Sequence, residues 1–120
     1  MLIDVHSHLD LCKDISGIVE RAREKGIVIV SAGVDVESNR KTLEYSGKWD
    51  NVKACLGLYP IDALKMSDKG IMGEIEFIRS NKDKISAIGE VGLDFKESDE
   101  KGKQEENFVK FIKLAKEIDK

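Results

Sequence analysis

The sequence is poor in the residues that mark disulfide-bonded or membrane-spanning proteins. Its 120 residues include two cysteines, one proline and 6% aromatic residues. No apolar run is long enough to span a bilayer, and there is no secretory signal pattern. Cys12 and Cys55 lie far apart in the chain, which favours free thiols, and reduced thiols are typical of the cytoplasm. We therefore expect a cytoplasmic protein with no membrane partner.

The chain also lacks an excess of basic residues. It has 20 Lys and Arg against 23 Asp and Glu, a net charge of −3, so no overall positive field attracts nucleic acid. Any contact with phosphate then needs a local positive source, such as a bound metal ion. The 41% hydrophobic and 36% charged residues are typical of one compact domain rather than of a disordered chain.

Hydrophobic patterning predicts a strand followed by a helix, four times in succession. Strands begin near residues 2, 27, 52 and 85, and helical stripes follow at 15–25, 36–46, 71–81 and 104–118. Asp14 and Asp35 are candidate N-caps, Gly26 and Gly47 are candidate helix ends, and 61–69 and 96–103 read as loops. This alternation predicts an α/β fold with a parallel sheet and right-handed crossovers.

Both histidines of the chain lie at the end of the first predicted strand. Alternation along a strand places His6 and His8 on one side, with Asp4 beneath them. Two neutral imidazoles so placed can bind one metal ion. Exposed or hydrogen-bonded histidines without a ligand are the alternative, but the neighbouring carboxylates favour a metal.

The carboxyl ends of the other strands bring further polar residues to the same edge. Glu90, between glycines after the fourth strand, needs a compensating charge, and a cation held by the histidines supplies it. Its two oxygens also suit a bridge between two ions about 3.5–4 Å apart. A capping or salt-bridged glutamate is the alternative. Asp94 is a candidate to orient a water, or a turn residue, and Tyr59 is a candidate substrate contact, or a packed aromatic.

Two long motifs resemble those of TatD-type metal-dependent deoxyribonucleases, which are amidohydrolase-like hydrolases. The run Asp4-Val5-His6-Ser7-His8-Leu9-Asp10 is similar to the family's opening D-x-H-x-H-L-D. The run Ala87-Ile88-Gly89-Glu90-Val91-Gly92-Leu93-Asp94-Phe95 is similar to its A-I-G-E-x-G-L-D-[YF] strand. Residues 30–35 and 57–60 match in position, as do Gln104, Phe108 and Ala115 in the helix that follows.

The resemblance implies the N-terminal half of a TIM-type (β/α)8 barrel that hydrolyses phosphodiester bonds in DNA, in several members as a 3′→5′ exonuclease. It implies that His6 and His8 bind one divalent ion and that Glu90 binds and bridges two, which could be Zn²⁺, Mg²⁺ or Mn²⁺. Catalysis would rest on Glu90 and Asp94, with Tyr59 near the substrate. DNA is the implied substrate.

The sequence departs from the family in two respects. Tyr59 stands where the third-strand motif G-x-H-P usually has histidine. The family's later metal-binding histidines and its acidic residue near the last strand have no counterpart in residues 1–120. We therefore expect a single half-barrel, part of a longer hydrolase and inactive alone, that needs a C-terminal half or self-association to close. The alternatives are a PHP-type phosphoesterase, an amidohydrolase or deacetylase, and a non-catalytic assembly module.

Overall fold

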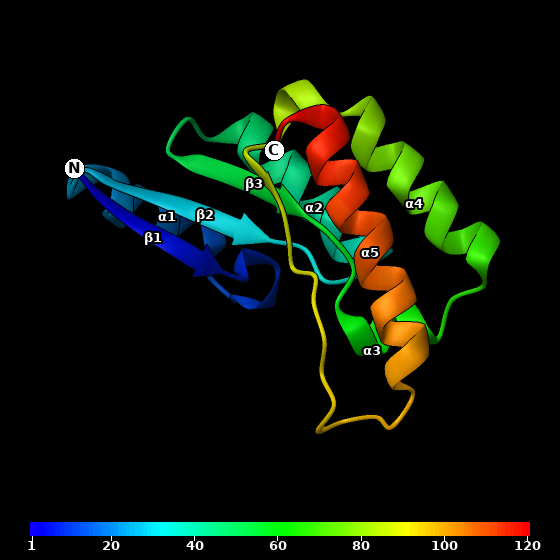
Figure 1. The fold of residues 1–120 in the computed structure, drawn as a ribbon. Helices are drawn as coiled ribbons and strands as arrows, with labels where there is room; N and C mark the ends of the chain where they lie inside the picture. The colour runs from blue at the N-terminus through cyan, green and yellow to red at the C-terminus, as the bar shows by residue number, and fades with distance from the viewer.

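The computed structural model describes residues 1–120 and contains four parallel strands that alternate with helices. Figure 1 shows the helices and the three longer strands. The strands are β1 (Leu2–Ser7), β2 (Ile27–Ala32), β3 (Val52–Leu56) and β4 (Ala87–Ile88). They pair in the order β1-β2-β3-β4, each parallel to the next. An order without reversal is that of a (β/α)8 barrel rather than of a doubly wound sheet. The predicted α/β fold with a parallel sheet is confirmed.

The helices begin where the sequence provides capping groups. They are α1 (Ile15–Glu24), α2 (Val36–Lys48), α3 (Pro60–Leu64), α4 (Asp68–Ser80) and α5 (Lys101–Ile118), with short 3-10 helices η1 (Leu9–Leu11) and η2 (Lys82–Lys84). The Asp14 carboxylate accepts from Gly17 N–H at 3.0 Å. Asp35 and Ser38 form a reciprocal capping box. Gly26 follows α1 with a φ of +66°, as a helix-ending glycine does. These predicted boundaries are confirmed.

Other predicted boundaries are wrong. The predicted loop 61–69 contains α3, which begins at Pro60, a residue whose fixed φ suits the first helical position. Gly47 lies inside α2 rather than ending it, since helical hydrogen bonding continues from Trp49 N–H to Tyr45 O. Helix α5 begins at Lys101, within the predicted loop 96–103. The fourth strand has two residues instead of the five predicted at 85–89.

The core lies between one face of the sheet and the helices. Along β3, Val52, Ala54 and Leu56 are buried, whereas Lys53, between them, is exposed. The larger apolar cluster joins β3 to α4 and α5 and comprises Ala54, Leu56, Leu58, Ala63, Ile71, Ile75, Ile78, Ile85, Phe111, Leu114 and Ile118. A smaller one joins η1, α1, β2 and β3 and comprises Leu9, Val19, Ala22, Ile29 and Val52. Packing on one face fixes the strands while their carboxyl ends stay accessible.

Strand β1 forms one edge of the sheet, far from α4 and α5 (Figure 1). Its first five residues are exposed, Leu2 at 66% and Val5 at 74%. Strands of parallel sheets are ordinarily covered on both faces, so this edge presents unusual apolar surface. None of the helices is both long and apolar enough to span a membrane.

Candidate metal centre

The end of β1 is fastened to β2 on both sides of His8. Ser7 Oγ donates to Val30 O at 3.1 Å, and Leu9 N–H donates to Ser31 Oγ at 3.2 Å. The β1–β2 register shifts between Asp4 and Ser7, so strict alternation does not run through this segment. The Asp4 carboxylate accepts from the backbone N–H of His6 at 3.3 Å, and it therefore serves the strand's own backbone.

The imidazole of His8 is oriented by one hydrogen bond. Its Nδ1 lies 2.9 Å from the carbonyl oxygen of Ala32, which only accepts, so we assign the proton to Nδ1. Its Nε2 then carries a lone pair and faces His6 and Glu90. A histidine whose other nitrogen donates to a carbonyl is the usual form of a metal-binding histidine.

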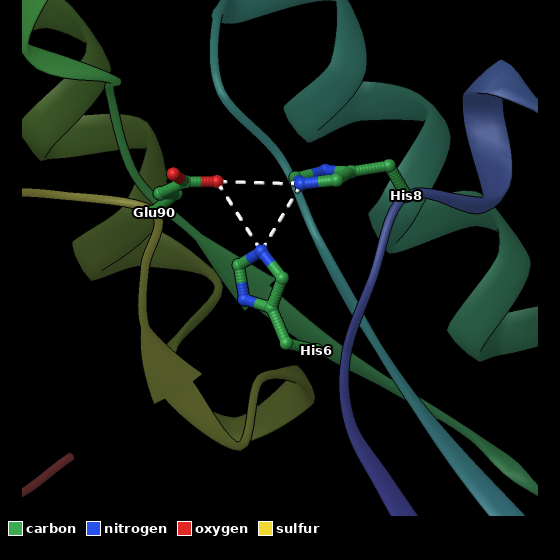
Figure 2. A group of neighbouring side chains, drawn as sticks. All are labelled: His6, His8 and Glu90. Carbon is green, nitrogen blue, oxygen red and sulfur yellow. Dashed lines mark hydrogen bonds and ion pairs between the residues drawn. The ribbon is translucent and has the colours of Figure 1, made fainter.

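Three ligand atoms converge at the strand ends. Nε2 of His6 and Nε2 of His8 are 3.1 Å apart, and Glu90 Oε2 lies 3.5 Å from the first and 3.3 Å from the second (Figure 2). At metal–ligand distances of about 2.0–2.2 Å, atoms around a tetrahedral ion lie about 3.3–3.6 Å apart. The triangle of His6, His8 and Glu90 thus has the dimensions of one face of such a site, and the two nitrogens and one carboxylate oxygen suit a divalent cation.

Glu90 reaches the histidines because the chain after β4 continues along β3. Gly89 N–H donates to Leu56 O and Glu90 N–H donates to Gly33 O, both at 2.9 Å. The peptide bond between Gly89 and Glu90 is cis. A Cβ atom added at Gly57 would lie 2.7 Å from Glu90 O, so this approach requires a glycine at position 57.

The structure places Asp94 outside this triangle. Its Oδ1 accepts from Lys96 N–H at 3.2 Å and Glu97 N–H at 3.1 Å, and its Oδ2 accepts from the Tyr59 hydroxyl. That hydroxyl and the Glu97 N–H lower the pKa of the Asp94 carboxyl, while the same bond raises the pKa of Tyr59 to about 12. The side chain of Gln104 binds the backbone of Asp94: its Oε1 accepts from Asp94 N–H, and its Nε2 donates to Asp94 O. The carboxylate ties two loops together, and a catalytic role for it stays a prediction.

Tyr59 borders an open pocket of about 530 Å³. Its lining comprises Tyr59, Ile61, Asp62, Lys65, Asp94, Lys96 and Glu97. The pocket is mixed in charge, with two lysines and three acidic residues. The predicted substrate contact of Tyr59 stays a prediction, and the hydroxyl that would make it already donates to Asp94.

Two buried polar residues behind the triangle, Asn39 and Glu74, were not among the residues that the sequence motifs single out. Asn39 Nδ2 lies 2.8 Å from Glu74 Oε1, and both side chains are buried. Two features of the sequence could have indicated them. Residues 36–46 have few apolar residues, so polar side chains must fill part of the buried face of this helix. Glu74 lies on the same helical face as the apolar residues Ile71, Ile75 and Ile78.

The strand order and the helix-covered sheet define part of an α/β barrel protein. Residues 3–120 match the protein family described as TatD related DNase, and the chain belongs to this family. It is 35% identical to an uncharacterized metal-dependent hydrolase of Methanocaldococcus jannaschii, over 98% of this chain and 47% of that protein. It is 29% identical to deoxyribonuclease TATDN3 of Homo sapiens, over 98% of this chain and 48% of the relative.

The fold agrees with a solved structure. The crystal structure of YjjV, a TatD homolog from Escherichia coli, superimposes with a TM-score of 0.85 at 27% sequence identity. The match covers 98% of this chain and 48% of that one. The chain thus spans about half the length of the relatives it matches, and its fold corresponds to half of their barrel.

Proposed function

We propose that this chain supplies part of the active centre of a metal-dependent phosphodiesterase that acts on DNA. The observation that carries the proposal is the convergence of His6, His8 and Glu90 within 4.8 Å of one another in a member of this family. It is supported by relatives named as metal-dependent hydrolases and by one named as a deoxyribonuclease.

In this proposal the three residues would hold two divalent ions. His6 and His8 would hold one ion, with Glu90 as its third ligand. The second carboxylate oxygen of Glu90 makes no hydrogen bond within the chain and would be available to the other ion. When bound, Zn²⁺, Mg²⁺ or Mn²⁺ supplies Lewis acidity toward a phosphate oxygen and lowers the pKa of water. The cations also provide the positive charge that a chain of net charge −3 needs near DNA.

We further propose that residues 1–120 form one half-barrel of a longer cytoplasmic hydrolase. The support is the share of its relatives that the chain covers, 47% and 48%, together with the uncovered β1 edge. Three ligands leave a metal centre incomplete, since zinc usually binds four groups. The remaining ligands would come from a C-terminal half or a second copy.

The test is metal-dependent cleavage of end-labelled DNA by the protein expressed from its complete gene. Activity should appear with Mg²⁺, Mn²⁺ or Zn²⁺ and disappear in His6→Ala. Leu11→Ala is the matched control, because Leu11 is 78% exposed near the same strand end and offers no ligand atom. Full activity in His6→Ala would overturn the proposal.

A substrate panel separates the rival activities. DNA, small phosphate esters and amides should be offered under the same metal conditions, and only DNA should be cleaved efficiently. Preference for small phosphate esters would indicate a PHP-type phosphoesterase, and preference for amides an amidohydrolase or deacetylase. Metal binding without hydrolysis of any of them would indicate a non-catalytic assembly module.

A further inference from the structure

We propose that Asn39 of α2 is a positioning residue for Glu90; this inference rests on the proposed metal-binding role of Glu90. Asn39 is fully buried. Its Nδ2 donates to Gly57 O at 2.8 Å, and its Oδ1 accepts from Gly57 N–H at 3.1 Å. The side chain therefore pairs with both backbone groups of the residue that follows β3, as a neighbouring strand would.

Asn39 contacts both glycines that hold the backbone of Glu90. Gly57 is one, since a Cβ there would lie 2.7 Å from both Glu90 O and Gly89 C. Gly33 is the other, because its carbonyl accepts from Glu90 N–H at 2.9 Å. A Cβ at Gly33 would lie 2.0 Å from Asn39 Oδ1. One amide side chain thus fixes the two surfaces between which Glu90 is held.

An ion pair between the buried Glu74 and the exposed Arg40 orients Asn39 in turn. Its Nδ2 also donates to Glu74 Oε1 at 2.8 Å, and Glu74 is 2% exposed. Arg40 donates to both oxygens of Glu74, at 2.7 and 2.9 Å, and lies over the ring of Phe77. With Nδ2 directed at two acceptors, Oδ1 is left to face the Gly57 N–H. Arg40 compensates the buried carboxylate, which keeps this arrangement intact.

Loss of the Asn39 hydrogen bonds should therefore displace Glu90, the metal ligand, more than it disturbs the fold. A metal centre binds tightly only if each ligand stands within about 0.5 Å of its place, and groups behind the ligands secure this. Asn39 touches no ligand side chain, but it sets the position of the Glu90 backbone relative to β3.

The test compares Asn39→Leu with Thr42→Val in the protein expressed from its complete gene. Both replacements keep the number and branching of the side-chain heavy atoms, and both sites are fully buried on α2, but Thr42 Oγ1 has no hydrogen-bond partner. Affinity for Co²⁺ is measured from its visible absorption bands and for Zn²⁺ by competition with a chromophoric chelator. Asn39→Leu should lower affinity at least about tenfold and alter the cobalt bands, while Thr42→Val should change neither.

Two further variants keep the test decisive. Asn39→Ser leaves room for a water and should also lower affinity, which covers the case in which Asn39→Leu fails to fold. Glu74→Gln retains an oxygen for Asn39 Nδ2 but turns an amide N–H₂ toward Arg40, which only donates, so it should lower affinity by less than Asn39→Leu does. Unchanged affinity and cobalt bands in folded Asn39→Leu or Asn39→Ser would overturn this inference while the proposed function stands. A wild-type protein that binds neither metal would overturn both.

Discussion

At the scale of single residues, the two ring nitrogens of His8 have different roles: one makes a hydrogen bond to the backbone, and the other is the proposed metal ligand. Nδ1 donates to Ala32 O at 2.9 Å, and Nε2 faces Glu90 Oε2 at 3.3 Å. In His8→Asn the amide can take over the bond to Ala32, but no atom replaces Nε2. We expect metal affinity to fall by more than about 100-fold, because a ligand is lost outright. Zinc titration calorimetry measures this.

The control for His8→Asn is its melting temperature without metal. If His8 were only a structural residue, His8→Asn would bind metal like the wild type, and that result would contradict the ligand role. His8→Ala, which loses both interactions, should bind metal no better than His8→Asn and melt at a lower temperature.

The pair of Tyr59 and Asp94 predicts a response to alkaline pH. The Asp94 carboxylate accepts the phenol proton in a hydrogen bond and raises the pKa of Tyr59 to about 12, above the ordinary value of about 10. A raised pKa in the folded state means that the associated stability is complete below about pH 10 and is lost as pH rises toward 12. In Asp94→Asn the pKa of Tyr59 should return toward about 10. The ultraviolet absorbance of tyrosinate follows the titration.

Tyr59→Phe assigns this titration, since the chain has two tyrosines. The absorbance step near pH 12 should be missing in Tyr59→Phe and shifted downward in Asp94→Asn. An identical step in the wild type and in Asp94→Asn would show that the two side chains are not paired in solution.

At the scale of elements, replacing Gly57 after β3 and replacing Gly47 inside α2 should have opposite effects on stability. A Cβ at Gly57 would meet the Gly89 backbone at 2.7 Å, whereas a Cβ at Gly47, inside α2, meets nothing within 4 Å. Gly57→Ala should destabilise the fold by about 1–3 kcal/mol through overpacking. Gly47→Ala should stabilise it by about 0.5–1 kcal/mol, because alanine loses less backbone entropy in a helix. Urea unfolding midpoints measure both, and equal shifts would contradict the described packing of Glu90 on β3.

The elements that the sequence predicts are those fixed by local chemistry. Asp14 and Asp35 cap the helices that follow them, and the β-branched run 27–30 forms strand β2, although only Ile29 of the run is buried. The prediction that Gly47 ends the second helix is wrong, because α2 continues to Lys48. A glycine ends a helix only where the chain needs a left-handed conformation or a new direction. Helix α3 was missed because its five residues are too few for a helical period to be recognised.

The candidate site is predictable only in part, for a similar reason. His6, His8 and Glu90 stand in motifs at strand ends, so strand order alone brings them near one another. Asn39 lies in the first turn of α2, and Glu74 lies 35 residues further on in the middle of α4. Their pairing arises only where these two helices meet in the fold. The local sequence of neither helix predicts this contact.

At the scale of the whole molecule, β1 is the least supported element. It pairs only with β2, and Leu2, Ile3 and Val5 are each at least half exposed. An apolar edge strand with open hydrogen-bonding groups invites association with another chain. In the relatives, about half of the protein lies outside the matched part. The half-barrel proposed above would account for this surface, since further β-α units or a second copy would cover it.

This proposal predicts how residues 1–120 behave when they are produced alone. The exposed β1 edge should drive self-association, visible by light scattering, and Val5→Lys should reduce it because an edge lysine opposes strand pairing. DNA cleavage should be slight with Mg²⁺ or Mn²⁺, because three ligands do not complete a metal centre. The protein expressed from its complete gene serves as the positive control. Strong metal-dependent DNA degradation by residues 1–120 that His6→Ala abolishes would show that this half contains, or by dimerising creates, a complete active centre.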